Sequence, residues 1–148
     1  METAYNPSLE EVFEREKKDL LETGISLTSF EVSTQRGMVA TIIDPEIMKG
    51  RDKYDAIKKI GKRFRDDGYS IDNVTFIMTG RNMQDHSQKV LLVCRKYVVT
   101  GNIQIIQEIF KVVKGNIEFV PNSRYLTDKA ESYIIDQFMS GYENKKWE

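Results

Sequence analysis

The sequence predicts an α+β fold with a mostly antiparallel sheet, in the order α-ββ-α-ββββ-α, and with the helices packed on one face of the sheet. Segments whose apolar residues recur at helical spacing alternate with short segments rich in β-branched residues. The connections between successive predicted strands are short, which requires antiparallel pairing, and helices then cover the sheet. No internal repeat, linker or low-complexity segment interrupts the chain, so we expect residues 1–148 to form one domain.

The first predicted helix begins after Ser8. Glu11 follows three residues later, which completes the reciprocal capping arrangement found at many helix starts. Apolar residues at helical spacing continue as far as Leu20. Gly24 then occupies the position at which glycine commonly ends a helix.

Two strands and a second helix are predicted next. The strands lie at 25–32 and 38–43, where β-branched and apolar residues are concentrated, and residues 34–37 form the turn. Asp44-Pro45 is typical of a helix start, because proline suits the first helical position. This helix has a possible break at Gly50 and ends at residues 66–68.

Four further strands are predicted at 73–83, 89–99, 102–113 and 117–120. The strand 89–99 is apolar on both faces, as expected in the middle of a sheet. Segment 102–113 also has apolar residues at helical spacing, so a helix is the alternative there. We favour a strand because six of its twelve residues are isoleucine or valine and turn sequences flank it.

A last helix is predicted from Thr127 as its cap to Gly141. It has a clear apolar face. Residues 142–148 are expected to form a frayed tail.

The composition excludes several classes of protein. With 40% hydrophobic and 30% charged residues, the chain lacks the signature of disorder. The single cysteine, Cys94, and the single histidine, His86, cannot supply an internal disulfide or the ligands of a structural zinc site. We therefore expect no metal and no cofactor.

The sequence also leads us to expect a cytoplasmic protein. Its first residues show neither the positive segment nor the apolar segment of a secretory signal. No apolar run approaches the roughly 18 residues of a membrane span, so we expect no membrane association.

Charge is distributed unevenly along a chain whose net charge is −1. Residues 1–23 hold seven acids and three bases, a net charge of −4, whereas residues 49–67 hold eight bases and four acids, a net charge of +4. The two segments could pair within one chain or between two copies. The candidate binding residues are the cations of the second segment that lie off its apolar stripe: Lys58, Lys59, Lys62 and Arg65.

The same basic helix, 49–65, is also compatible with binding to nucleic acid, because phosphate contacts dominate the affinity of such complexes. Two observations weigh against it. Acidic residues are interleaved among the bases, and the pI is about 6.0, whereas nucleic-acid-binding domains are usually basic.

The hairpin tip 81–88, where the strands 73–83 and 89–99 are joined, supplies the remaining candidates, Arg81, Asp85 and His86. Histidine transfers protons readily near neutral pH, but a catalytic triad requires residues that converge from separate segments. We interpret these residues as a polar hairpin loop.

Three other residues, Cys94, Glu31 and Tyr97, are weaker candidates for a functional role. Cys94 lies within an apolar strand, where cysteine usually behaves as a small hydrophobic residue. Glu31 and Tyr97 could line a pocket between sheet and helices.

No catalytic motif is evident, so we predict a small binding or assembly protein rather than an enzyme, and we expect it to form a homo-oligomer. The alternatives are an accessory nucleic-acid-binding domain and an enzyme or small-molecule binder with a pocket between sheet and helices. The sequence does not identify the ligand of such a pocket.

Overall fold

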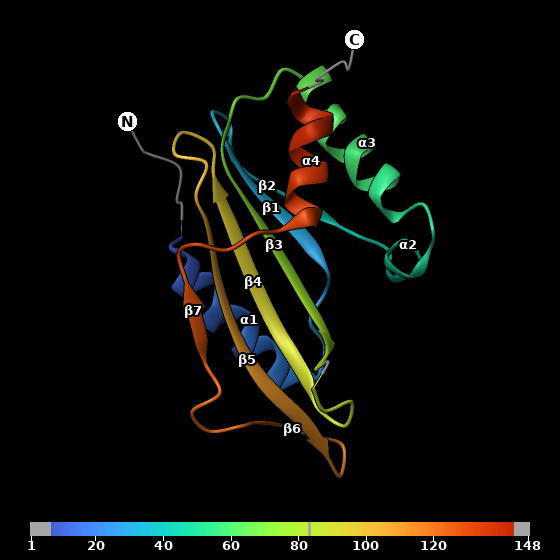
Figure 1. Ribbon diagram of the computed structural model, residues 1–148, viewed down its shortest axis with the longest axis vertical. Helices are drawn as coiled ribbons and strands as arrows, with labels where there is room; N and C mark the ends of the chain where they lie inside the picture. The colour runs from blue at the N-terminus through green and yellow to red at the C-terminus, as the bar shows by residue number, and fades with distance from the viewer. Residues whose placement is uncertain (1–6, 83, 144–148) are drawn as a thin grey trace.

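The computed structural model describes residues 7–82 and 84–143 (Figure 1). Its elements in chain order are α1 (Leu9–Thr23), β1 (Ser29–Thr34), β2 (Gly37–Ile42), α2 (Pro45–Lys49), α3 (Lys53–Asp66), β3 (Ile71–Arg81), β4 (Lys89–Tyr97), β5 (Ile103–Val113), β6 (Asn116–Phe119), β7 (Tyr125–Thr127) and α4 (Tyr133–Glu143).

The strands form one sheet in the order β2-β1-β3-β4-β5-β6, with β7 also pairing with β5. Every recorded pair is antiparallel. Figure 1 shows three long strands, β3, β4 and β5, running side by side through the middle of this twisted sheet. The prediction of an α+β fold with a mostly antiparallel sheet is confirmed.

Segment 102–113 is a strand, as its isoleucine and valine content predicted. It forms β5, which pairs with β4 along one side and with β6 and β7 along the other. Alternate side chains of β5 lie on opposite faces of the sheet, and both faces carry apolar residues, which explains the apparent helical spacing.

The second helix is divided into α2 and α3 at Gly50, where the sequence indicated a break. Two other element boundaries differ from the prediction. The first strand begins at Ser29 rather than at residue 25. The last helix begins at Tyr133 rather than after Thr127, because Thr127 belongs to β7 and pairs with Ile105. Ser132 is the residue before α4, and its hydroxyl accepts a hydrogen bond from the amide of Ile135 at 3.2 Å.

The end of α4 also differs from the expected tail. Tyr142 is part of the helix, and its hydroxyl donates to the carbonyl oxygen of Tyr69 at 2.7 Å. This contact ties the end of α4 to the loop before β3. The rest of the predicted tail, 144–148, lies outside the described residues.

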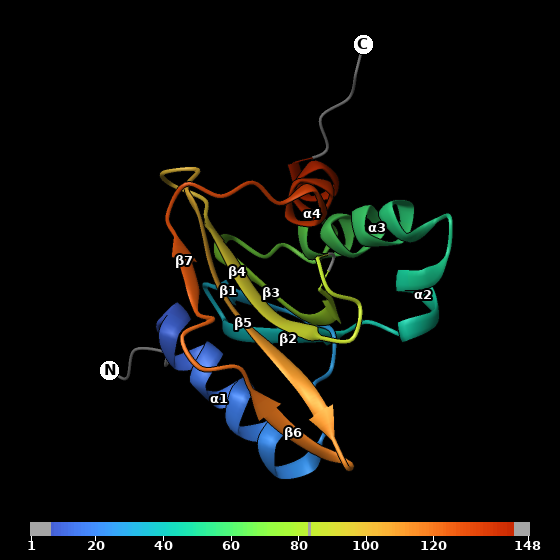
Figure 2. The same ribbon diagram turned by 60° about the horizontal axis from the view of Figure 1, so that its bottom comes forward.

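The sequence suggested that the helices pack on one face of the sheet. This part of the prediction is wrong, because helices cover both faces. Figure 2 shows α1 on one side and α3 with α4 on the other. One hydrophobic cluster joins α1 to the sheet, and its buried members are Leu9, Val12, Phe13, Leu20, Ile77, Leu91, Val93, Ile106 and Phe110. The other joins α3 and α4 to the opposite face, with Ile57, Phe64, Ile135 and Phe138 packed on Phe30, Val32, Val74, Phe76 and Cys94 among others. A second layer is required because β3 and β4 are apolar on both faces.

The α3 and α4 helices pack unusually closely, at two glycines. A Cβ atom built on Gly61 would lie 1.9 Å from the carbonyl oxygen of Phe138, and one on Gly141 would lie 1.9 Å from that of Lys58. The two helix backbones are therefore in direct contact, and the pair sits on the sheet as one unit.

None of the helices in residues 7–82 and 84–143 is long and apolar enough to cross a membrane.

Candidate binding trough

The α3 and α4 helices cover only one end of the sheet face on which they lie (Figure 1). The eleven residues of α4 extend about 16 Å along the helix axis. Each of β3 and β5 also has eleven residues, but an extended strand of that length spans about 36 Å. A large part of the face therefore extends beyond the helices.

Nine residues of β3, β4 and β5 form a grid on this face, and strand register places them in three rows. The row nearest the helices is Phe76, Cys94 and Ile105; the next is Met78, Leu92 and Gln107; the last is Gly80, Val90 and Ile109. Gln107 is the one polar side chain in the grid. An uncovered face of an antiparallel sheet is usually polar, so this composition indicates a surface that receives a ligand.

The inner end of the grid is closed by the helices. A hollow of about 240 Å³ lies here, walled by Tyr54 of α3 and by the residues that lead into α4, Glu131 to Ile134. The rings of Tyr54 and Tyr133 meet edge to face with their centroids 4.6 Å apart. This aromatic contact bridges α3 and α4 at the wall of the hollow.

The outer end of the grid is open. A second hollow of about 380 Å³ continues from the first, because both are lined by Met78 and Leu92. Its rim is polar and comes from Arg81, Asn82 and Gln84. The three rows together span about 13 Å along the strands, and we call the two hollows and the grid between them the trough.

The polar rim is held by hydrogen bonds within the β3–β4 loop. The Nδ2 of Asn82 donates to the Oε1 of Gln88 at 3.2 Å, and the amide of Gln84 donates to the Oδ1 of Asn82 at 3.1 Å. Loop residues commonly carry function when a rigid scaffold positions them, and here the scaffold is the β3–β4 hairpin.

Cys94 lies at the inner end of the trough as a buried, protonated thiol. Burial raises the pKa of this thiol to about 11. Its sulfur lies 3.8 Å from the Oγ of Ser132. A thiol is nucleophilic as the thiolate, so Cys94 contributes an apolar surface at neutral pH, in line with its interpretation from the sequence.

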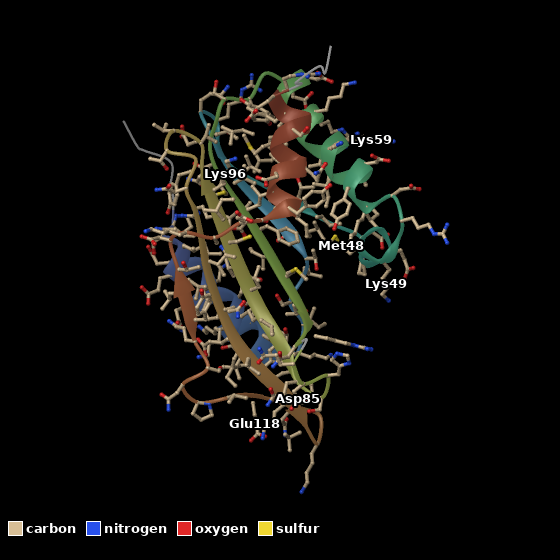
Figure 3. The ribbon with its side chains drawn as sticks, viewed as in Figure 1. Met48, Lys49, Lys59, Asp85, Lys96 and Glu118 are labelled. Carbon is tan, nitrogen blue, oxygen red and sulfur yellow. The ribbon has the colours of Figure 1, made fainter. Side chains whose placement is uncertain are left out.

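Of the three candidates predicted in the β3–β4 hairpin tip, only one lies at the trough. Arg81 lies on the rim of the outer hollow, whereas Asp85 and His86 are exposed and do not line it. Figure 3 shows Asp85 at the tip of the loop. Hydrogen bonds from the hydroxyl and the amide of Ser87 lower the pKa of Asp85, so this carboxylate stabilises the turn.

The cations of α3 lie apart from the trough. Lys58, Lys59 and Lys62 are exposed, and no ion pair is recorded for them in the described ranges. Arg65 is half-buried and pairs with its neighbour Asp66 at 3.1 Å. Figure 3 shows Lys59 on the side of α3 that faces away from the sheet.

The acidic helix α1 does not pair with α3, because the sheet separates them. Its Glu10 and Glu14 instead contact Arg124, in the segment before β7. Arg124 also donates through Nε to Glu108 at 2.6 Å, and Glu108 accepts a second bond from Lys17 at 2.9 Å. This network ties α1 to β5. No motif marks Arg124, which reaches its partners only through the fold.

A buried polar cluster lies under α1, on the face opposite the trough. Arg95 is 2% exposed; its Nε donates to Thr75 at 2.7 Å and its Nη1 to the carbonyl oxygen of Pro7 at 2.8 Å. Glu31 lies on the same row as Thr75 and pairs with Arg15 of α1. Tyr97 donates to Gln104 at 3.2 Å and also lies outside the trough. Arg95 and Glu31 hold α1 and the segment before it against the sheet.

A further hollow of about 510 Å³ lies between the start of α1, β5 and β7. Glu10 and Asp128 stand on its wall, so an apolar or anionic ligand would meet two acids there. In the described ranges no group of three or more His, Cys, Asp or Glu side chains could hold a metal ion. We take the trough as the candidate site because apolar side chains of three strands line it.

The chain matches no protein-family model, no curated protein and no solved structure.

Proposed function

We propose that the protein binds an elongated, largely apolar small molecule in the trough, without converting it chemically. The observation that carries this proposal is the outer two rows of the grid, where apolar side chains from three strands are partly exposed beyond the helices: Met78, Val90, Leu92 and Ile109. A ligand that covers them gains roughly 25 cal/mol for each Å² of apolar surface removed from water.

The distribution of polar groups gives the ligand an orientation. The inner end offers aromatic rings and a protonated thiol, whereas Arg81, Asn82 and Gln84 stand at the open end. The apolar body of the ligand then lies over Leu92 towards the helices, and its polar end lies at the loop. An aliphatic chain with a carboxylate or another polar end meets both requirements.

Calorimetric titration with aliphatic carboxylates, the corresponding alcohols and apolar dyes tests the proposal. The variant Leu92→Gln keeps a side chain of similar size but places an amide under the ligand. An unpaired amide costs about 1–3 kcal/mol, so we expect the Kd to rise about tenfold.

Val99→Gln is the matched control, because Val99 is 94% exposed and does not line the trough. It should bind as the wild type does. Failure of the wild type to bind any of these molecules, or equal affinity in the Leu92→Gln variant, would contradict the proposal.

A further inference from the structure

The strand β2 forms one edge of the sheet, and its backbone groups on that side have no partner strand in the described residues. The amide of Ile43 donates to the carbonyl oxygen of Thr28 at 2.9 Å, which places Ile43 in the hydrogen-bonded set that faces β1. Because these sets alternate along an antiparallel pair, the amides and carbonyls of Met38, Ala40 and Ile42 point outward.

This edge lacks the features with which proteins usually prevent strand pairing. Natural sheet edges carry lysines, prolines or bulges, or are very short. The six residues of β2 are Gly-Met-Val-Ala-Thr-Ile, with no charge and no proline. The opposite edge differs, because β6 has four residues and carries Glu118, which Figure 3 shows near the lower end of the sheet.

Exposed apolar residues gather beside β2. Ile42 is 63% exposed, and Ile25 and Leu27, in the segment before β1, are 62% and 51% exposed. These three residues line one groove of about 580 Å³ between α1 and β2, together with Ala40. Large apolar side chains grouped in this way are typical of a surface that is covered by a partner.

We infer that two copies of the chain pair antiparallel through β2 and form a continuous sheet across a twofold axis. An edge strand is complementary to itself in this arrangement, since a twofold axis makes identical strands antiparallel. One register pairs all three outward-facing residues: Ala40 faces Ala40 of the second copy on the axis, and Met38 faces Ile42 of the second copy.

The charges that flank β2 agree with this register. Arg36 lies in the turn before the strand and Asp44 is the cap residue of α2 after it, so the inferred register brings each Arg36 to the end of the strand that carries Asp44 in the second copy. Complementary charges at the rim of an interface set its register more than its strength. The trough lies on β3, β4 and β5, so the interface leaves it open, and the inference does not depend on the proposed function.

The variant Ala40→Pro tests the pairing. Its amide points outward and takes no part in the β1–β2 ladder, so proline removes no hydrogen bond within the chain at an edge position that tolerates it. The substitution does remove the hydrogen bonds that the amide of residue 40 donates between the two copies. By light scattering after gel filtration, the wild type should have twice the 17.2 kDa mass of the chain, and the variant 17.2 kDa.

Glu118→Lys is the control, since it adds a lysine to the opposite edge and should leave the dimer intact. Far-ultraviolet circular dichroism should show that both variants are folded. A wild type that stays at 17.2 kDa in concentrated solution, or an Ala40→Pro variant that is folded and still dimeric, would overturn the inference.

Disulfide trapping tests the register. Cysteine variants keep every backbone hydrogen bond between the two copies, which Ala40→Pro does not. In the inferred register the two Ala40 Cα atoms lie about 5.5 Å apart, within the range of a disulfide. The two Thr41 Cα atoms lie about 8 Å apart, beyond that range. Ala40→Cys should cross-link under mild oxidation and Thr41→Cys should not, while the native Cys94 is buried. Cross-linking of Thr41→Cys in preference to Ala40→Cys would show a different register and overturn this one.

Discussion

Replacement of Gly61 by alanine is the perturbation whose cost follows most directly from the structure. In a helix interior alanine is favoured over glycine by about 1 kcal/mol, so the change would stabilise an isolated α3. In the folded chain the new methyl group would lie 1.9 Å from the carbonyl oxygen of Phe138 and 2.9 Å from its carbon. Both atoms belong to the backbone of α4, so a side-chain rotation cannot relieve the clash.

The size of the effect follows from the distance that the helices must move. A carbon atom approaches a carbonyl oxygen to about 3.4 Å, so α3 and α4 must separate by about 1.5 Å at this point. Separation loosens the contact of Phe64 with Phe138, whose ring centroids are 5.6 Å apart. Overpacking of this kind costs about 1–3 kcal/mol and occasionally more. We expect the free energy of unfolding to fall by about 2 kcal/mol. A fall of this size lowers the Tm of a domain of this length by about 4–8 °C.

Urea unfolding followed by circular dichroism measures this loss, and Gly50→Ala is the matched control. Gly50 has a φ of −80°, and the nearest atoms to its added Cβ are 3.5 Å away. Alanine fits there without a clash and should leave the stability unchanged or raise it by up to about 1 kcal/mol. If Gly61→Ala were as stable as Gly50→Ala, the close packing of α3 on α4 would be refuted.

Three further predictions concern charge and the thiol. Glu108→Gln should cost about 1–3 kcal/mol in urea unfolding, because the buried carboxylate has two cationic partners, whereas Glu118→Gln at an exposed site should cost less than about 0.5 kcal/mol. The double variant Lys59→Glu/Lys62→Glu should keep its mass and stability, and neither it nor the wild type should bind oligonucleotides at low salt; salt-dependent binding by the wild type alone would favour the nucleic-acid alternative. Because burial raises the pKa of Cys94 from 9.0 to about 11, the folded protein keeps a proton that the unfolded chain loses. Stability should therefore fall as pH rises from 9 to 11, by up to about 3 kcal/mol, and a Cys94→Ala variant should lack this dependence.

Local sequence signals predicted those parts of the fold that depend on neighbouring residues. The capping box of Ser8 and Glu11 is present, with the amide of Glu11 donating to the Oγ of Ser8 at 3.1 Å. The predicted start of the last helix was wrong. Thr127 and Ser132 are both residue types that cap helices, and Thr127 is excluded only because it belongs to β7, which pairs with β5. The placement of α1 on the opposite face was also missed, since it depends on the two-sided apolar character of β3 and β4 together.

The trough could not be predicted from the sequence. Met78, Leu92 and Ile109 come from three strands, and they become neighbours only through the register of the sheet. Their apolar character is also what a buried core requires, so nothing in the sequence marks them as uncovered. Of the residues chosen from the sequence, Arg81 reaches the rim because the hairpin that carries it ends at the trough.

The proposal that the trough is the binding site is tested most directly by the methyl resonances of methionine during titration with an aliphatic carboxylate. Met78 lies in the middle row of the grid, whereas Met38 is in the edge strand β2 and belongs to neither hydrophobic cluster. Saturable movement of the Met78 resonance, with that of Met38 unchanged, is the predicted result. Binding that moves Met38 and leaves Met78 unchanged would contradict it.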